Sequence, residues 1–554
     1  MNPLVIVYLN NLMDFVLGKI AFDSARKMEN PKIVVLTGDL SYAVRRGILR
    51  INQAIPDISW LIVIHSPVKT FKVLLKNQWR NLCRNGLRWI PYQLGEIFKL
   101  VFSIKLEPLT ITDPGYYYSQ EAFQSYSNIT ILTVSDIHGA DTLEAIQTFS
   151  PNLGISLAAP ILKKVLFSIP KLGTLNLHKG KLPDFRGMPP AFWELWNDID
   201  LVGCSVHWVD EKLDSGAVVK EHTIQKQPFS NLKGLQLSLD EVGCDLMSSA
   251  VKAVLENTAQ AVPQTAGGKT YRKPTLEQIN SLNRKMQAKL ALPGSLLRYL
   301  KDSIFFTRIC YQRWLPVSLK KPKIVVLLYH RVSDDTRDNL TVGIEQFDRQ
   351  MALLRRHYHV LSIHELIHDS NIKVSAKPMV CVTFDDGYLD NYENAVPVLL
   401  KHGIPAAFFV STGIIDRGDV FPHDIRRQNP KLPVMTWQQL RIMRDEGFTI
   451  GSHSVNHIDC ASEAEETVRS ELTQSLMDVR RELGLQEVMF AYPYGGRHHM
   501  TPQRLQLVKE AGYTACLSAY GGVNINTIDR FNIVRSGIHY EFSDWAFRNR
   551  CEGY

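Results

Sequence analysis

The stretch MVCVTFDDG, residues 379–387, decides the fold of the C-terminal half of the chain. Its apolar run is typical of a strand buried in a parallel sheet, and the two acids and the glycine that follow are typical of a loop at the strand's end. Similar strand-like runs, separated by helical segments such as 345–357 and 436–447, occur at 323–332, 404–412, 448–454, 487–496 and 513–520. Repeated strand–helix units predict a (β/α) barrel, whose reactive groups lie at the carboxyl ends of the strands.

The N-terminal half shows the same alternation. PKIVVLTGD (31–39) is an apolar run closed by Gly-Asp, and further strand-like and helical stretches follow it at 42–54, 59–66, 130–136, 141–149 and 153–159. Strands that alternate with helices predict an α/β fold with a Rossmann-like parallel sheet. No G-x-G-x-x-G motif follows the first strand, which argues against a nicotinamide-dependent enzyme.

A chain of 554 residues is too long for a single hydrophobic core. We expect an N-terminal extension (1–30), a first domain (31–282), a linker (283–322) and a second domain (323–554). Residues 294–323 carry seven Lys or Arg and one Asp, interleaved with apolar side chains. This composition favours a helical linker between the domains; a basic amphipathic element on an anionic membrane is the alternative.

Cysteine usage and the absence of export signals point to a cytoplasmic protein. The eight cysteines form no C-x-x-C pair, and scattered thiols fit a reducing compartment. The apolar first 22 residues lack a basic start and a clear cleavage site. We therefore expect a cytoplasmic location, with membrane association only through the basic linker. The net charge of +8 by itself selects no partner.

Two acids and two histidines suggest a metal site in the second half. Asp385 and Asp386 follow one predicted strand, and SHSVNH places His453 and His457 after another. The four-residue spacing predicts two imidazoles on one face of a helical turn. Asp386, His453 and His457 would ligate a divalent metal that polarises an amide carbonyl, and Asp385 would serve as general base.

These motifs resemble the polysaccharide deacetylases, the NodB homology domain. TFDDG, the S-H-S-x-x-H segment and the later Tyr-Pro-Tyr-Gly carry the resemblance, which covers about 323–540. It implies a distorted (β/α) barrel that removes acyl groups from sugars with zinc or a similar metal. It also implies Asp385 as base, Asp386, His453 and His457 as ligands, and the backbone amide of Tyr494 as an oxyanion donor.

The chain departs from that family pattern at two places. Many members have an arginine ahead of the proline of the third motif, where this chain has Ala491 and Tyr492. Many members also carry a Leu-x-x-His motif whose histidine protonates the leaving amine. The corresponding region here reads NIVRSGIH, so that His539 is a weak candidate for the acid.

A carboxamide, an imidazole and a carboxylate stand out in the first half. Asn176 and His178 alternate at the end of a predicted strand, and Asp214 lies in a Leu-Asp-Ser-Gly turn. When an acyl group is transferred to an amine, an asparagine side chain can stabilise the oxyanion of the tetrahedral intermediate. A histidine and an aspartate can move the proton of the amine. No activated Ser or Cys is apparent, which favours direct transfer over an acyl-enzyme.

The same segment resembles the formyltransferases that use 10-formyltetrahydrofolate. Asn-x-His, then LPDFRG (182–187), then the Asp214 turn carry the resemblance, which extends over about 31–282. It implies Asn176, His178 and Asp214 as the catalytic trio and a bound folate. HKGKLP (178–183) departs from the His-Pro-Ser-Leu-Leu-Pro that is usual in the methionyl-tRNA enzymes. Those enzymes also carry a C-terminal tRNA-binding barrel, and here the linker and the second domain stand in its place.

The leading hypothesis is therefore a bifunctional enzyme of amino-sugar modification. The first domain would formylate an amino sugar, either a small molecule or one carried on a lipid, and the second would hydrolyse an acetyl or formyl amide. In one alternative only the hydrolase is active and the first domain is a binding or regulatory module. In another the chain formylates tRNA, although it shows no compact basic surface with interleaved aromatics, and nucleic acid is not expected as a partner.

Overall fold

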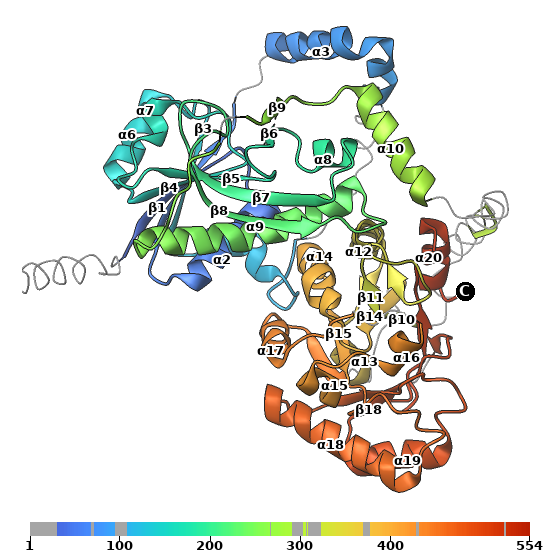
Figure 1. The fold of residues 1–554 in the computed structure, drawn as a ribbon. Helices are drawn as coiled ribbons and strands as arrows, with labels where there is room; N and C mark the ends of the chain where they lie inside the picture. Colours follow the sequence, from blue (N-terminus) through green and yellow to red (C-terminus); the bar gives the residue numbers. More distant parts are fainter. Residues whose placement is uncertain are drawn as a thin grey trace, which may run out of the picture. The chain divides into compact units, whose positions relative to one another are not determined.

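The computed structural model describes residues 30–67, 71–94, 108–265, 267–290, 303–305, 307, 323–368, 377–427, 432–525 and 528–554 (Figure 1). The predicted N-terminal extension, apart from Asn30, and most of the predicted linker lie outside the described residues. The described residues form two compact units. The described residues of unit 1 lie within 1–98, 120–226 and 235–283, and those of unit 2 lie within 99–119, 227–234 and 284–554. The predicted domain boundaries stay predictions.

Unit 1 is built on a mostly parallel sheet. The order of its described strands is β3 (Ile129–Val134), β2 (Ser59–His65), β1 (Lys32–Thr37), β4 (Leu153–Leu157), β5 (Thr174–His178), β7 (Leu201–Trp208) and β8 (Val218–Gln225). β1 to β5 run parallel, whereas β7 and β8 are antiparallel additions. β1 and β4 are buried along nearly their whole length, because a parallel sheet covered on both faces needs apolar residues at successive positions.

Helices and a small second sheet complete unit 1. The helices are α2 (Tyr42–Ala54), α3 (Phe71–Asn85), α5 (Gln120–Ser125), α6 (Ala140–Phe149), α7 (Lys164–Phe167), α8 (Phe192–Trp196), all but the first three residues of α9 (Leu232–Leu255), the beginning of α10 (Leu276–Leu290), and a 3-10 turn at Gly86–Arg88. β6 (Phe185–Gly187) pairs in parallel with β9 (Lys269–Tyr271). This pairing brings the LPDFRG segment next to the late GGKTY segment.

Unit 2 is built on a sheet that is parallel except at β19 and curls into a distorted barrel. Its described strands follow the order β18 (Ala515–Leu517), β17 (Met489–Ala491), β16 (Thr449–Ser452), β15 (Ala406–Val410), β14 (Met379–Phe384), β10 (Lys323–Tyr329) and β19 (Asn524–Ile525). β13 (His359–Val360) also pairs with β14, and β20 (Arg535–Gly537) also pairs with β10. A bridge from Leu517 to Ile533 joins β18 to the segment that enters β20, so the last stretch of the chain spans the seam.

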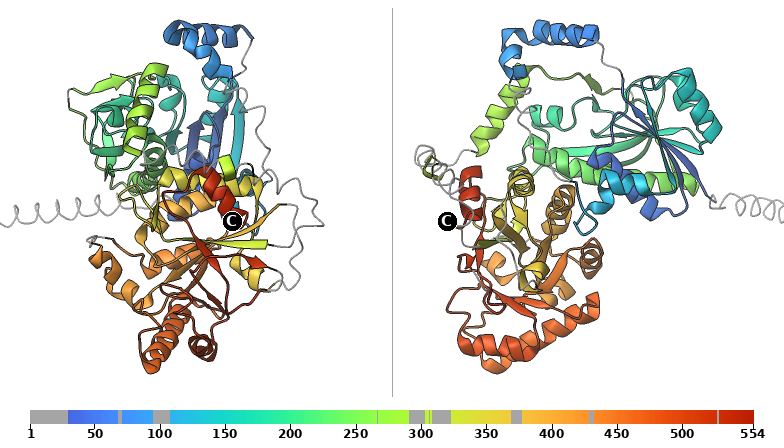
Figure 2. Two further views of the ribbon diagram at one scale, coloured as in Figure 1. Left: turned by 90° about the vertical axis from the view of Figure 1, so that its right-hand side faces the viewer. Right: turned by 180° about the vertical axis from the view of Figure 1, so that it is seen from behind.

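Helices lie around this sheet (Figure 2). They are α12 (Ile344–His357), α13 (Ile363–His368), α14 (Val396–His402), α15 (Thr412–Arg417), α16 (Pro422–Arg426), α17 (Trp437–Asp445), α18 (Glu465–Leu483), α19 (Pro502–Ala511) and α20 (Asp544–Cys551). Short pieces occur at β11 (Arg331–Val332), β12 (Thr341–Val342), the 3-10 turn Tyr116–Tyr118 and the π-helical turn Asn391–Ala395. A capping box between Thr436 and Gln439 fixes the start of α17.

The predicted fold class is confirmed in both halves. The apolar runs that were predicted as strands form the cores of the two sheets, and the predicted helices at 42–54, 141–149 and 345–357 form as α2, α6 and α12. Among the described residues, no helix combines the length and the apolar composition needed to cross a membrane.

A buried acid in α8 makes the stability of unit 1 depend on pH. The side chain of Glu194 is buried, and burial raises the pKa of Glu194 to about 7. Because the unfolded chain releases this proton near pH 4.5, the stability contributed by the protonated form is complete below that pH and is lost as the pH rises to about 7.

We therefore expect Glu194→Gln to stabilise unit 1 at pH 8 by up to about 3 kcal/mol and to have little effect at pH 4.5. Urea unfolding followed by tryptophan fluorescence at both pH values measures the difference. Glu144→Gln, at an exposed position of α6, is the matched control and should change neither value. The expectation would be contradicted if the difference in the free energy of unfolding between wild type and Glu194→Gln were the same at both pH values.

Candidate active sites

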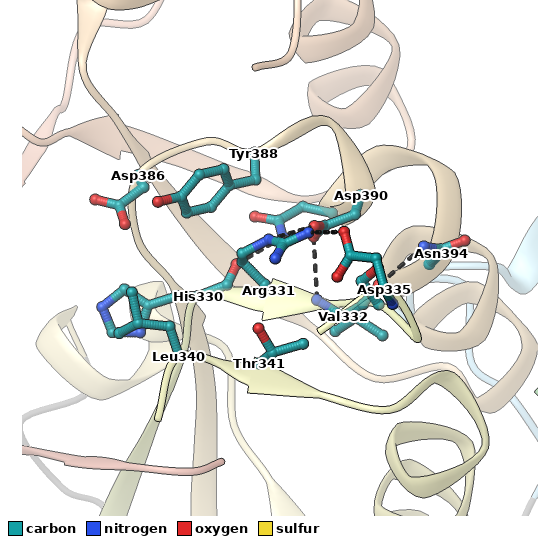
Figure 3. Close-up of polar contacts among 12 residues, drawn as sticks. His330, Arg331, Val332, Asp335, Leu340, Thr341, Asp386, Tyr388, Asp390 and Asn394 are labelled. Atoms are coloured by element: carbon teal, nitrogen blue, oxygen red, sulfur yellow. Dashed lines mark hydrogen bonds and ion pairs between the residues drawn. The ribbon is translucent and has the colours of Figure 1, made fainter. Parts of the chain in front are cut away.

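The carboxyl ends of β14 and β16 bring together the three residues predicted as metal ligands. Asp386 Oδ1 lies 3.3 Å from His457 Nε2 and 3.6 Å from His453 Nε2. All three side chains are buried, and one ligand atom from each lies within 4.8 Å of the others. Figure 3 shows the Asp386 carboxylate in the loop just after β14, the edge at which a barrel carries its reactive groups.

The hydrogen bonding of these residues fits a bound divalent metal. Among the described residues, Asp386 Oδ1 is buried without a hydrogen-bond donor. His453 Nδ1 bonds to the carbonyl oxygen of Ala491 at 2.7 Å, which makes Nδ1 the protonated nitrogen and leaves the Nε2 lone pair facing Asp386. Burial lowers the pKa of His453 to about 4, so its imidazole is neutral at pH 7, as a metal ligand must be.

The predicted helical turn between the two histidines is wrong. Residues 453–457 form an irregular loop, in which Ser454 has φ 64° and His457 has φ 54°. The two rings still meet, with centroids 4.9 Å apart, although the backbone between them is not helical. The left-handed region is unfavourable for residues with a Cβ atom. The pair is therefore held by the loop's surroundings rather than by helical periodicity.

The predicted base, Asp385, is held by a residue that the sequence analysis missed. Arg535 Nη1 and Nη2 each donate a hydrogen bond to one carboxylate oxygen of Asp385, both at 2.6 Å. Both side chains are buried. Burial opposes ionisation of Asp385, but the charge of Arg535 outweighs it and the pKa of Asp385 falls below its ordinary value. The signal that could have found it is that Arg535 is the single cation within the apolar segment NIVRSGIH.

Two further histidines lie beside Asp386. His423 Nε2 is 3.8 Å from Asp386 Oδ2 and 2.9 Å from the hydroxyl of Tyr388. His330, the residue after β10, is close enough to interact electrostatically with Asp385 and Asp386. In Figure 3 the His330 ring and the Asp386 carboxylate project to the same side. In the sequence, His330 lies in the strand-like run 323–332 and has no predicted role.

The backbone on both sides of His330 is held by side chains from the turn after β14 (Figure 3). The His330 carbonyl accepts a hydrogen bond from Asn391 Nδ2 at 2.7 Å. Asp390 accepts from the Val332 N–H at 3.0 Å and from Arg331 Nε at 2.9 Å. The backbone around His330 is therefore held by the same segment that carries Asp386.

The last two predicted residues have different surroundings. The exposed ring of Tyr494 packs edge-on against His457, with centroids 4.9 Å apart, and its backbone has φ 61°. His539 contacts Phe542 and Tyr540, and the described contacts of its ring include no residue of the metal cluster. Tyr494 is thus brought into the site, whereas the assignment of His539 stays a prediction.

In unit 1 the structure brings Asn176, His178 and Asp214 together at the end of β5. His178 Nδ1 lies 3.6 Å from Asp214 Oδ2, and His178 Nε2 donates to the Phe185 carbonyl at 2.6 Å. Burial lowers the pKa of His178, so the ring is neutral at pH 7 and Nδ1 is available as a proton acceptor. Asp214 sits in a turn with φ 51°, which turns its carboxylate back toward β5.

A fourth residue of this cluster, His207 on β7, was also missed. Its Nδ1 donates to the Trp208 carbonyl at 2.8 Å, so Nε2 is the acceptor for the amide of Asn176, 3.1 Å away. Asp214 Oδ1 lies 3.7 Å from the same nitrogen. His207 therefore fixes which way the Asn176 carboxamide points. Burial opposes ionisation of Asp214, but its two histidine neighbours and the Gly187 N–H, which donates to Oδ2 at 3.0 Å, outweigh it and lower the pKa of Asp214.

The buried Arg535–Asp385 pair gives a stability prediction for unit 2. Arg535→Met removes the charge and the hydrogen bonds but keeps a long side chain, and it leaves Asp385 buried without compensation. We expect a loss of about 3–5 kcal/mol in the free energy of unfolding. Urea unfolding measures it, and the double variant Arg535→Met with Asp385→Asn should recover a large part of the loss. A double variant no more stable than Arg535→Met would show that packing, not charge, sets the loss.

The chain is similar to two families. Residues 120–251 match the family model of the formyl transferases, and residues 373–516 match that of the polysaccharide deacetylases. The methionyl-tRNA formyltransferase of Flavobacterium psychrophilum is 30% identical over 129 residues, which are 23% of this chain and 41% of that protein. YxkH of Bacillus subtilis, whose name describes a polysaccharide deacetylase, is 29% identical over 201 residues, which are 36% of this chain and 65% of that protein.

The chain thus spans less than half the length of the first of these relatives and less than two thirds of the second. A solved structure, the Streptococcus pyogenes deacetylase PplD in complex with acetate, is 24% identical with a TM-score of 0.37, and the match covers 42% of this chain and 99% of that chain. Both predicted resemblances are confirmed: in one polypeptide, a segment that matches the formyl transferase model is followed by one that matches the polysaccharide deacetylase model.

Proposed function

We propose that the protein is a bifunctional enzyme of amino-sugar modification. Unit 1 transfers a formyl group from 10-formyltetrahydrofolate to the amine of an amino sugar, and unit 2 hydrolyses an N-acyl amide on a carbohydrate. The observation that carries the proposal is the convergence of Asp386, His453 and His457 beside an ionised, arginine-bound Asp385. The cluster of Asn176, His178 and Asp214 supports the transferase half.

In unit 2, Asp386, His453 and His457 would hold a divalent cation such as zinc, which supplies Lewis-acid polarisation of the amide carbonyl. Asp385 accepts a proton from the attacking water, and Arg535 keeps Asp385 ionised for this step. The ring of Tyr494 packs against His457, which places the residue beside the site. Its backbone N–H donates a hydrogen bond to the oxyanion.

The leaving amine needs a proton, and His330 is better placed than His539 to supply it. His330 follows β10 directly and interacts with both aspartates of the site. Its backbone is held through Asn391 and Asp390, which limits the positions the ring can take. The described contacts of His539 are instead with its sequence neighbours Tyr540 and Phe542.

In unit 1, Asn176 donates a hydrogen bond to the oxyanion of the tetrahedral intermediate, since His207 takes only one of its two amide hydrogens. His178 accepts the proton of the attacking amine through Nδ1, and the carboxylate of Asp214 stabilises the imidazolium that results. Folate would donate the formyl group directly, because no serine or cysteine nucleophile takes part in the proposed steps.

The proposed substrate is a small-molecule amino sugar or one carried on a nucleotide or lipid phosphate. Both reactions involve the same functional group, an amine that is free in one state and acylated in the other. The cysteines that the structure describes are unpaired, which is consistent with the proposed cytoplasmic location. A tRNA substrate is the competing proposal, since the formyltransferase relatives are named for it.

Removal of the metal should separate the two activities, because only the proposed hydrolysis in unit 2 uses one. Nucleotide-linked amino sugars and tRNA are incubated with the full chain and 10-formyltetrahydrofolate, with and without a chelator, and products are identified by mass spectrometry. We expect a formylated sugar in the presence of chelator, its loss in Asn176→Ala, and amide hydrolysis that is lost in chelator or in Asp386→Ala. Each variant controls for the other site. No formylated sugar under either condition would refute the transferase half, and formylated tRNA instead would identify the competing substrate.

A second test assigns the proton donor of unit 2. His330→Ala should lower kcat for amide hydrolysis by about 10²- to 10⁴-fold with a much smaller change in KM. His539→Ala, the matched control, should stay within about threefold of wild type, since its ring contacts lie elsewhere. Steady-state kinetics on an N-acetyl amino sugar measure both. The opposite pattern would assign the acid to His539.

A further inference from the structure

A second group of metal-binding side chains lies outside both candidate sites. His364 and His368 are on α13, four residues apart and therefore on one face of the helix, with ring centroids 5.9 Å apart and planes at 12°. Glu487, two residues before β17, completes the group: its Oε2 lies 2.8 Å from His368 Nε2. One ligand atom from each of the three residues lies within 4.8 Å of the others, and all three side chains are exposed.

This group lies at the edge of the unit 2 sheet opposite the candidate active site. Asp385 follows the carboxyl end of β14, whereas Glu487 precedes the amino end of β17. The buried residues Ile363, Leu366 and Ile367 of α13 belong to one apolar cluster with Met379 and Met489, the first residues of β14 and β17. The helix is thus fixed by packing at this edge, while its two histidines point away from the core.

We propose that His364, His368 and Glu487 form a second divalent metal site that takes a zinc-type transition ion. Two imidazole nitrogens and one carboxylate are zinc ligands, and three protein ligands leave a position for water. Magnesium and calcium prefer oxygen ligands and fit this group poorly. On coordination the ion replaces the proton shared between His368 and Glu487, and that proton is released to solvent or moves to the other ring nitrogen.

The ion would link parts of the chain that are 119 residues apart. Its binding energy is available only when α13 and the segment before β17 are in their native positions, so the ion stabilises the folded unit. β17 is short, and the carbonyl of Ala491 at its other end orients His453. The ion would therefore fix the amino end of the strand whose carboxyl end supports the proposed catalytic metal site.

Metal stoichiometry of the full chain tests the proposal. The protein is stripped with a chelator, equilibrated with Zn²⁺, separated from free metal, and its zinc content is measured by mass spectrometry. The double variant His364→Ala with His368→Ala should hold one equivalent less than wild type and should keep the zinc that is lost in His453→Ala. His359→Ala, which removes an exposed histidine from neighbouring β13, is the matched control and should bind as much as wild type.

Affinity and stability give independent readouts. Calorimetric titration with Zn²⁺ should show Glu487→Gln to weaken this site by tenfold or more, about 1.4 kcal/mol, because a carboxamide is a poorer ligand than a carboxylate. The thermal midpoint of unit 2 should rise with Zn²⁺ in His453→Ala and not in the combined variant that also lacks His364 and His368. Equal zinc content in wild type and in the double variant would overturn the proposal, and so would an unchanged affinity in Glu487→Gln. Neither result depends on whether unit 2 is a deacetylase.

Discussion

One buried ion pair, between Arg535 and Asp385, connects the closure of the unit 2 sheet to its chemistry. Arg535 lies on β20, which pairs with β10 and lies at the seam of the curled sheet. Its guanidinium donates to Asp385 on one side and, through Nε, to the Ser518 carbonyl just after β18 at 2.6 Å. The last strand of the sheet therefore cannot separate without leaving the predicted base uncompensated in an apolar interior.

The same pair explains how a carboxylate buried this deeply remains ionised. A lone buried carboxyl group takes up a proton, and a protonated Asp385 could not accept one from water. Arg535 is held by the seam, so its charge does not have to be brought into place when the substrate binds. The neighbouring Asp386 is kept ionised differently: burial opposes it, but the histidines around it, His457 first among them, outweigh burial and hold the pKa of Asp386 well below its ordinary value. Two adjacent aspartates thus have separate partners, which allows one to be a base and the other a ligand.

How much of this was predictable depends on whether an interaction is local in the sequence. The strands were predictable because buried parallel strands are apolar at successive positions, and the site residues at the ends of those strands followed from the fold. Asp385, Asp386, Asn176 and His178 all belong to this class. Arg535 and His207 do not, because their roles depend on register between strands far apart in the chain. The spacing of His453 and His457 predicts a helical turn, but their loop has left-handed backbone at Ser454 and His457. Such a backbone conformation cannot be predicted from the spacing of residues in the sequence.

Left-handed backbone recurs at the candidate residues of both units. Asp214, Asp386, His457 and Tyr494 all have positive φ, a region that costs roughly 1–3 kcal/mol for a residue with a Cβ atom. Each of the four lies just after a strand or in a tight turn, where the chain must reverse and still direct a functional group back over the sheet. Glycine would relax the backbone at Asp214, Asp386 and His457 only by removing the carboxylate or imidazole that the proposed mechanisms use, and at Tyr494 it would remove the ring that packs against His457.

If both proposed activities operate, the balance of atoms restricts their order on one substrate. Formyl transfer consumes an amine and hydrolysis releases one, so formylation followed by removal of the same formyl group would only hydrolyse the folate donor. Hydrolysis of a different acyl group, followed by formylation of the amine it exposes, exchanges one acyl group for another and leaves a net product. In that order the amine released in unit 2 is the nucleophile that His178 deprotonates in unit 1, so the specificity of unit 2 for its acyl group must exclude the formyl amide that unit 1 forms.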